Sequence, residues 1–187
     1  MTTMSPTEEA LALFSSRGHE HHGEVIDQQS HALQSAVLAQ AAGADDALVV
    51  ATLLHDIGHL VVATDHGPRS DRSIDDDHHE AVGARWVAPR FGPIVARSIA
   101  LHVLAKRYRC TVDPSYFDTL SPASIETLHA QGGLLDTAAV ARFEAHPGCA
   151  DALALRGWDE AAKDPHVTTV GLEEFRALLE RVAIYEG

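Results

Sequence analysis

Cysteine, aromatic residues and long hydrophobic runs are scarce in this chain of 187 residues. The sequence contains two cysteines, Cys110 and Cys149, which argues against a disulfide framework and favours a reducing compartment. No stretch approaches the roughly 18 consecutive apolar residues that span a membrane. The N-terminus also lacks the basic and then apolar regions of a secretory signal. We therefore expect a cytoplasmic protein that has no membrane partner.

Positive charge is scarce as well. Lysine and arginine number 14 against 27 acidic residues, and the resulting net charge of −13 argues against nucleic acid as a partner. A hydrophobic content of 45% fits one domain with a substantial core, spanning residues 1–187. Alanine, leucine and valine dominate and favour helix, and no segment shows the alternation of a strand. The sequence therefore predicts a single all-α domain.

Hydrophobic spacing and capping residues divide the chain into helices joined by polar segments. Residues 64–77 are expected to form a polar loop, which is long for a passive connection. A break is expected at Phe91-Gly92-Pro93. The metal-binding core described below spans about residues 20–165 and precedes a C-terminal helix. The predicted helices cover about residues 7–16, 23–42, 46–58, 78–90, 94–108, 122–131, 137–145, 148–162 and 171–185.

The pair His55-Asp56 follows the apolar run 47–54, which is typical of a buried helix. Burying a polar group without a partner costs on the order of 2–7 kcal/mol, and a charge costs more. A metal cation is the simplest partner for a neutral imidazole beside a carboxylate. The pair therefore raises the question of whether other segments supply further ligands.

Further histidines and a carboxylate stand in apolar segments elsewhere in the chain. A single buried histidine is more often a hydrogen-bonded core residue than a ligand, so the whole set indicates a metal site more strongly than any one member. His78 could replace His79, but the glycine at position 83 favours His79. Imidazole and carboxylate donors without cysteine suit iron, manganese or catalytic zinc. The candidate metal ligands are His31, His55, Asp56, His79, His102 and Asp159.

The order of these residues resembles that of the HD-domain superfamily, an all-helical metal-dependent fold. His79-Glu-Ala-Val-Gly83 matches the family's His-x-x-x-Gly element, and the resemblance covers about residues 20–165. It implies that Asp56 bridges two metal ions. Most members are phosphohydrolases, in which the metal activates water. A smaller branch contains mixed-valent di-iron oxygenases.

Three further features resemble the phosphonate-cleaving (PhnZ-type) oxygenases of that branch. Lys106 lies one turn beyond His102, and Arg156 precedes Asp159 by three residues. Short polar side chains at i, i+3 and i+7 share one face of the helix that begins near residue 122. An ordinary solvated helix surface or a surface salt bridge would explain each feature taken alone. The residues that the resemblance implies for substrate binding are His21, Glu24, His59, Lys106, Ser124, Thr127, Gln131 and Arg156.

Two of these positions carry particular expectations. Glu24 would face the amino end of the substrate, and it is placed on the same helix as His31. His21 stands where the oxygenase branch has a tyrosine that caps a metal, so both that role and the substrate's substituent stay open.

The resemblance implies a di-iron oxygenase (Fe2+/Fe3+) that uses O2 to cleave the carbon–phosphorus bond of a small organophosphonate. An example of the substrate is 2-amino-1-hydroxyethylphosphonate, and the products are a carboxylate and inorganic phosphate. His59, Asp56 and Lys106 would be the catalytic residues. The alternatives are a metal-dependent phosphohydrolase acting on a nucleotide or phosphomonoester, and a catalytically silent metal-binding domain.

Overall fold

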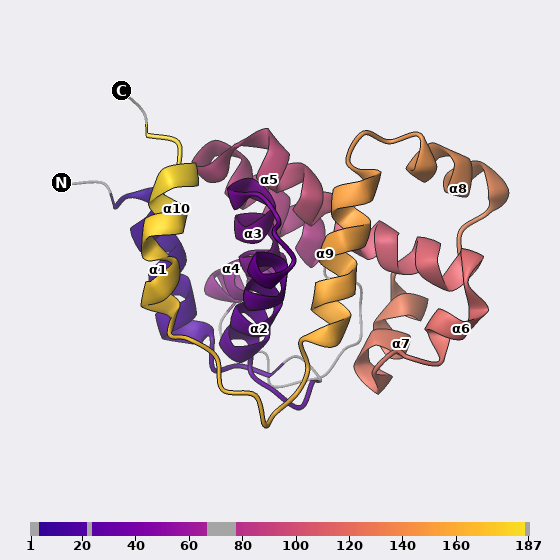
Figure 1. Cartoon of the computed structure of the whole chain (residues 1–187), viewed down its shortest axis with the longest axis horizontal. Coiled ribbons are helices and arrows are strands. Elements are labelled where there is room, and N and C mark those ends of the chain that lie inside the picture. Colours follow the sequence, from indigo (N-terminus) through magenta and orange to yellow (C-terminus); the bar gives the residue numbers. More distant parts are fainter. Residues whose placement is uncertain (1–3, 22–23, 67–77, 186–187) are drawn as a thin grey trace.

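The computed structural model describes residues 4–21, 24–66 and 78–185, and this part of the chain contains helices and no strand (Figure 1). The predicted all-α fold is confirmed. In chain order the elements are α1 (Pro6–Arg17), α2 (Gln28–Ala41), α3 (Asp46–Leu53), α4 (Ile57–His66), α5 (His79–Val112), α6 (Pro114–Phe117), α7 (Pro122–Ala130), α8 (Thr137–Glu144), α9 (Cys149–Ala161), the 3-10 helix η1 (Leu172–Phe175) and α10 (Arg176–Val182).

Helix α2 begins later than the sequence pattern predicts. The Asp27 side chain accepts a hydrogen bond from the backbone N–H of Ser30 at 2.7 Å, which makes Asp27 the N-cap and Gln28 the first helical residue. The predicted start at residue 23 is therefore wrong. As a result Glu24 lies in the preceding loop and not on the helix that carries His31.

The predicted buried helix 46–58 is two helices with a turn between them. Helix α3 ends at Leu53 and α4 begins at Ile57, so His55 and Asp56 lie in the turn. The backbone N–H of Ile57 donates to the carbonyl oxygen of Leu54 at 3.0 Å, which satisfies the backbone locally. Helix α4 continues to residue 66, beyond the expected start of the polar loop at 64. The rest of that loop, 67–77, lies outside the described residues.

Gly58 allows α4 to cross the start of α5 at very short range. A Cβ atom at this position would lie 2.0 Å from the backbone oxygen of His79, which no real side chain tolerates. The absence of a side chain therefore brings the turn that carries Asp56 next to His79.

We expect Gly58→Ala to destabilise the fold, because the added methyl group forces the two helices apart. Overpacking of a core costs about 1–3 kcal/mol, and thermal unfolding measures the loss. Gly157→Ala is the matched control, since its Cβ would meet nothing closer than 3.9 Å and alanine favours helix. Equal stability of the two variants would contradict this account of the crossing.

Helix α5 is bent at Gly92, which has φ 89° and ψ 169° within an otherwise helical element. The expected break at this glycine is confirmed, and the second half extends beyond the predicted 108 to Val112. In a straight helix the 23 residues between His79 and His102 would span about 35 Å. The bend instead brings the Nε2 atoms of the two imidazoles to 3.2 Å from each other.

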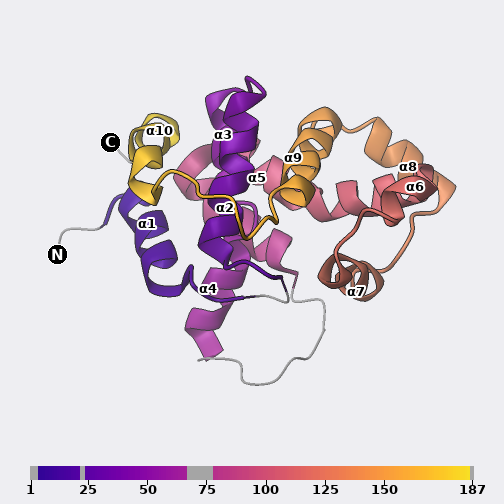
Figure 2. The same ribbon diagram turned by 60° about the horizontal axis from the view of Figure 1, so that its bottom comes forward.

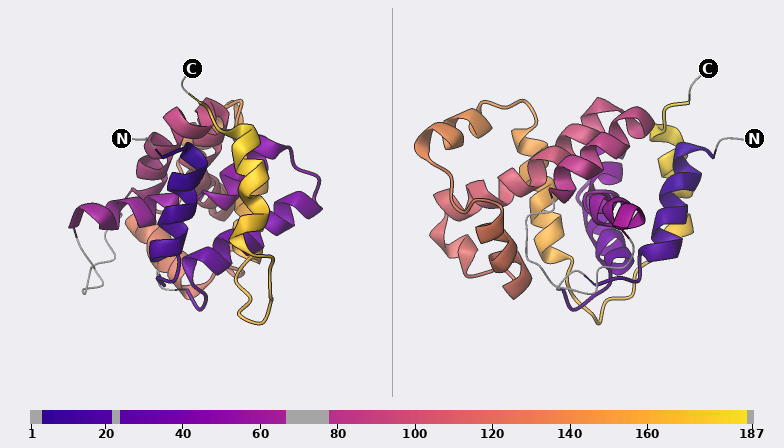
Figure 3. Two further views of the ribbon diagram at one scale, coloured as in Figure 1. Left: turned by 90° about the vertical axis from the view of Figure 1, so that its left-hand side faces the viewer. Right: turned by 180° about the vertical axis from the view of Figure 1, so that it is seen from behind.

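The main core lies where α2, α3, α4, α5 and α9 meet, and it is filled by aliphatic side chains such as Val50, Leu53, Ile99 and Leu155. Helices α1 and α10 lie side by side at one end of the molecule, close to both termini (Figures 1 and 2). Helices α6, α7 and α8 occupy the opposite end, beyond α9 (Figure 3).

The predicted C-terminal helix 171–185 is shorter in the structure. A 3-10 turn over 172–175 leads into α10, which ends at Val182. Phe175 and Leu179 anchor this segment in the main core. Within the described ranges, no helix combines the length and apolar character needed to cross a membrane.

Candidate metal centre

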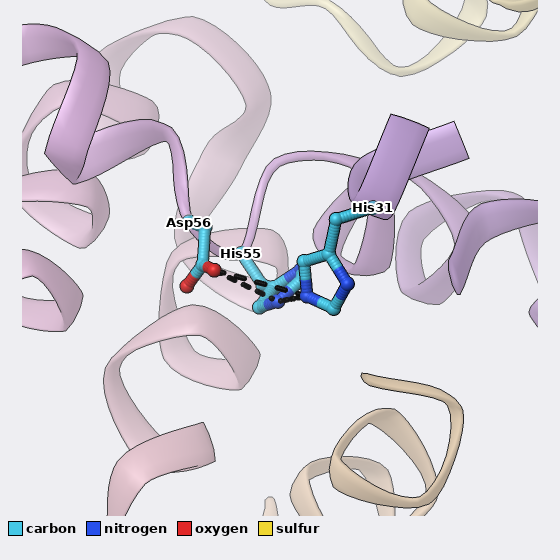
Figure 4. A group of neighbouring side chains, drawn as sticks. All are labelled: His31, His55 and Asp56. Atoms are coloured by element: carbon cyan, nitrogen blue, oxygen red, sulfur yellow. Dashed lines mark hydrogen bonds and ion pairs between the residues drawn. The ribbon is translucent and has the colours of Figure 1, made fainter. Parts of the chain in front are cut away.

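Four predicted ligands meet between α2, α9 and the turn that follows α3. The Nε2 atom of His31 lies 3.2 Å from Nε2 of His55 and 3.2 Å from Oδ1 of Asp159. Asp56 adds its Oδ2 atom at 3.5 Å from His55 and 3.8 Å from His31 (Figure 4). His31, His55 and Asp159 are buried and Asp56 is partly exposed. We call these four residues the first ligand group.

The hydrogen bonds of the two imidazoles determine where their protons lie. The Nδ1 atom of His31 is 2.8 Å from the carbonyl oxygen of Ala162, and that of His55 is 2.8 Å from the carbonyl oxygen of Thr52. A carbonyl oxygen only accepts, so both Nδ1 atoms must donate. In the neutral rings the Nε2 atoms then carry lone pairs that face each other at 3.2 Å. A proton on one ring or a metal cation held by both relieves this contact, so the two Nε2 atoms are suited to serve as metal ligands.

A second ligand group lies on the other side of Asp56. The Nε2 atoms of His79 and His102 are 3.2 Å apart, and they lie 3.4 and 3.7 Å from Oδ1 of Asp56. The Nδ1 atom of His102 faces the carbonyl oxygen of Ile99 at 2.7 Å, so its Nε2 also carries a lone pair. His59 stacks on His79 with ring centroids 4.1 Å apart, and it offers a donor atom within 4.8 Å of those of Asp56 and His79.

Asp56 connects the two groups, because Oδ2 faces His31 and His55 while Oδ1 faces His79 and His102. A carboxylate with one oxygen directed at each group has the geometry of a bridging ligand. The donors are imidazole nitrogens and carboxylate oxygens, a set that fits a pair of iron, manganese or zinc ions. The structure thus brings together all six of the candidate metal ligands.

Burial and neighbouring charges keep most of these groups in the protonation state that binds metal. Burial acts to raise the pKa of Asp56, but the surrounding histidines hold it far below its usual value. Burial lowers the pKa of His102 to about 3, reinforced by His79 and His55, and it also lowers the pKa of His55. For His31, burial acts to lower the pKa, but the hydrogen bond to Asp159 and its charge raise it.

We expect the metal-free protein to lose stability as the pH falls from about 6.5 towards 3. The unfolded chain binds protons on its histidines near pH 6.5, whereas folded His55 and His102 resist protonation. A group whose pKa is depressed by folding stabilises the fold above its unfolded pKa and ceases to do so as the pH falls. The raised pKa of His31 opposes this trend only in part.

Urea unfolding of the chelator-treated protein between pH 7.5 and 5 measures this loss. His102→Gln removes one of the two depressed groups and should make the pH dependence of the unfolding free energy less steep. An equally steep dependence in that variant would show that His102 is not a source of the effect.

Lys106 places a buried ammonium group near the metal ligands. Its side chain is 4% exposed, and Nζ donates to Oγ1 of Thr127 at 2.9 Å. Burial lowers its pKa to about 8, with Arg156 adding to the effect and the carboxylates of Asp159 and Asp56 opposing it. Among the residues that the structure describes, Lys106 makes no ion pair with a carboxylate. It therefore has charge available for an anion.

Arg156 holds the carboxylate of Asp159 in place. Its guanidinium pairs with Asp159 Oδ2 and with Glu160 Oε2, and Nε donates to the hydroxyl of Tyr116 at 2.8 Å. Burial acts to lower the pKa of Arg156, but these partners raise it, so the guanidinium stays charged. Because Arg156 binds Oδ2, the other oxygen of Asp159 is left to face His31.

The remaining predicted substrate-binding residues lie in three different settings. Ser124 is buried, and its Oγ accepts a hydrogen bond from Nζ of Lys163 at 2.9 Å. Gln131 is buried at the end of α7, and its Oε1 atom has no hydrogen-bond partner within the described ranges. His21 is exposed, with Nδ1 at 3.4 Å from the carbonyl oxygen of Glu24.

The sequence matches the family model of the HD domain over residues 29–131, which is more than half of the chain. The chain belongs to the HD domain family. The matched region includes Asp56 and every histidine of the two ligand groups, whereas Asp159 lies beyond it.

Three proteins resemble this HD domain protein over most of its length. A hydroxymethylphosphonate dioxygenase of Gimesia maris is 39% identical over 179 residues, which cover 94% of this chain and 89% of the relative. A 1-hydroxy-2-(trimethylamino)ethylphosphonate dioxygenase (glycine-betaine-forming) of Leisingera caerulea is 36% identical, with 91% and 86% covered. An uncharacterized protein of Acanthamoeba polyphaga mimivirus is 31% identical, with 87% and 74% covered.

Sequence reasoning missed several residues of this HD domain site. Tyr116 and Glu160 bind Arg156, and Lys163 and Ser121 bind Glu24. Arg156, Glu160 and Lys163 follow one another at i, i+4 and i+7, a spacing that could have indicated one helix face. For Tyr116 and Ser121 the sequence offers no comparable signal, because their contacts come from distant segments.

Proposed function

We propose that this HD domain protein is a di-iron oxygenase that cleaves the carbon–phosphorus bond of a 1-hydroxyphosphonate. The reaction consumes O2 and gives a carboxylate and inorganic phosphate. Two relatives that are 36–39% identical over about nine tenths of the chain are named as dioxygenases of such compounds, which supports the reaction class. The cytoplasmic location and the lack of a nucleic-acid partner stay predictions from the sequence.

The observation that carries the proposal is the pair of ligand groups joined by Asp56 beside the buried ammonium of Lys106. Two iron ions would be held by His31, His55 and Asp159 on one side and by His79 and His102 on the other. When bound, the iron pair supplies the redox chemistry with O2. His59 lies close enough to the second group to assist it.

The phosphonate would lie between the metal ions and α7. Lys106 provides positive charge, and Thr127, Ser124 and Gln131 provide short polar groups on one helix. An unpaired buried amide costs about 1–3 kcal/mol, so the free Oε1 atom of Gln131 supports a polar ligand beside it. Arg156 would contribute through its charge while it orients Asp159.

The test is phosphate release from hydroxymethylphosphonate by the iron-loaded protein, with and without O2. Atom balance requires one O2 for each phosphate released, because the substrate plus O2 has the composition of formic acid plus phosphoric acid. Release that depends on O2 in this ratio supports the oxygenase. Equal release under anaerobic conditions would contradict it and favour the metal-dependent phosphohydrolase.

A further inference from the structure

Lys163 lies among the polar side chains of the proposed substrate site, just after the end of α9. Its Nζ atom is 3.0 Å from Oε1 of Glu24, 3.3 Å from Oε2 of Glu160 and 2.9 Å from Oγ of Ser124. Ser121 adds a fourth oxygen at 3.2 Å. The Lys163 side chain is 13% exposed, so this is a largely buried arrangement.

Glu24 is the acidic group that could recognise a positively charged substrate at this edge of the site. Its loop precedes α2, and its Oε1 atom accepts a hydrogen bond from Oγ of Ser121 at 2.8 Å. A carboxylate beside a ligand pocket attracts ammonium groups. Here the same oxygen already binds the ammonium of Lys163, so the chain itself neutralises the charge of Glu24.

The ammonium of Lys163 keeps its charge in this setting. Burial acts to lower its pKa, but Asp159, Glu160 and Glu24 raise it above the usual value. A second cation brought to Glu24 by a substrate would therefore meet a positive charge about 3 Å from that carboxylate. Two cations that bind the same carboxylate lie close to each other, and like charges that close repel strongly in a partly buried site.

We propose that Lys163 is a specificity-determining residue, because its ammonium occupies the place beside Glu24 and Ser124 that a cationic substituent of the substrate would take. The protein then selects 1-hydroxyphosphonates whose substituent at the hydroxyl-bearing carbon carries no positive charge. This inference rests on the proposed function. The sequence alone leaves the nature of that substituent open.

Kinetics with two substrates test this role. The iron-loaded protein is assayed with hydroxymethylphosphonate and with 2-amino-1-hydroxyethylphosphonate, and the ratio of the two kcat/KM values is compared between variants. The wild-type protein should prefer hydroxymethylphosphonate by at least about tenfold. Lys163→Met should shift the ratio about 10- to 100-fold towards the amino compound, mainly through its KM, because a charged contact to Glu24 becomes available.

Three variants make this result specific. Lys163→Arg keeps the charge and should keep the wild-type preference. Lys163→Gln removes the charge but keeps hydrogen-bond donors, so it gives the same shift even if the methionine variant is unstable. Adding Glu24→Gln to Lys163→Met should abolish the shift, because no carboxylate then remains to bind the amine.

The outcomes separate the two proposals. A wild-type protein that releases phosphate, together with an unchanged substrate ratio in Lys163→Met and Lys163→Gln, would overturn the role of Lys163 alone. An equal loss of activity with both substrates would likewise overturn it, since Lys163 would then bind the phosphonate. A wild-type protein inactive with both substrates would overturn the proposed function and with it this inference.

Discussion

Asp56→Asn is expected to abolish the paired metal site and the activity that depends on it. The substitution keeps the size of the side chain but removes the negative charge that faces both ligand groups. Loss of residues that only orient metal ligands costs about 10- to 100-fold in affinity or activity, so loss of a shared ligand should exceed 100-fold. Iron analysis and phosphate release measure the two effects.

Asp151→Asn is the matched control for this experiment. Asp151 lies on α9 with a side chain that is 39% exposed, and it faces Arg97 at 3.9 Å. Exposed ion pairs of this kind contribute about 0–1 kcal/mol, so this control should bind iron and turn over as the wild type does. Two iron ions per chain and full activity in Asp56→Asn would refute the bridging role of Asp56.

Lys106→Met is expected to lower activity and to raise stability at the same time. Its ammonium is buried without a carboxylate partner in the described part of the chain, a costly arrangement that an apolar side chain of similar length relieves. Loss of a charged hydrogen bond to the phosphonate costs about 2–3 kcal/mol, or about 30- to 150-fold in kcat/KM.

Thermal unfolding and steady-state kinetics on the same preparation check both parts of this prediction. Arg85→Met serves as the control, because Arg85 is exposed on α5 and the substitution removes one positive charge there. A Lys106→Met variant that loses stability but keeps kcat/KM would show that this lysine supports the fold and not the substrate.

Candidate metal ligands could be predicted from the sequence where they stand within or directly after an apolar segment. His55 and Asp56 follow a buried run and His102 lies within another, and burial without a partner is physically costly there. Their order along the chain then indicated the family. The two ligand groups share Asp56 because α4 crosses α5 at Gly58 and because α5 bends at Gly92. The sequence predicts the break at Gly92 but gives no sign of the crossing.

The errors in the predicted helices have local causes. An apolar run shows that a segment is buried, but it does not show where a turn interrupts it, so the division between Leu53 and Ile57 was missed. The late start of α2 could have been predicted from Asp27, which is followed at the right distance by Ser30. That error placed Glu24 on a helix, although it lies in a loop.

The surroundings of the substrate site could not be predicted because they arise from contacts between distant segments. Lys163 meets Glu24 across 139 residues of sequence and meets Ser124 across 39. Arg156 meets Tyr116 across 40. The resemblance implies Glu24, Ser124 and Arg156, whereas nothing in the sequence alone points to Lys163 or Tyr116. Only the structure shows that these two residues contact the others.

Titration of the metal-free protein with ferrous iron under air tests the central claim most directly, with O2-dependent phosphate release and electron paramagnetic resonance as readouts. Activity is expected to rise until two iron ions are bound per chain, together with the signal of a coupled Fe2+/Fe3+ pair. Full activity with one metal ion per chain, or with zinc in place of iron, would contradict a di-iron centre bridged by Asp56.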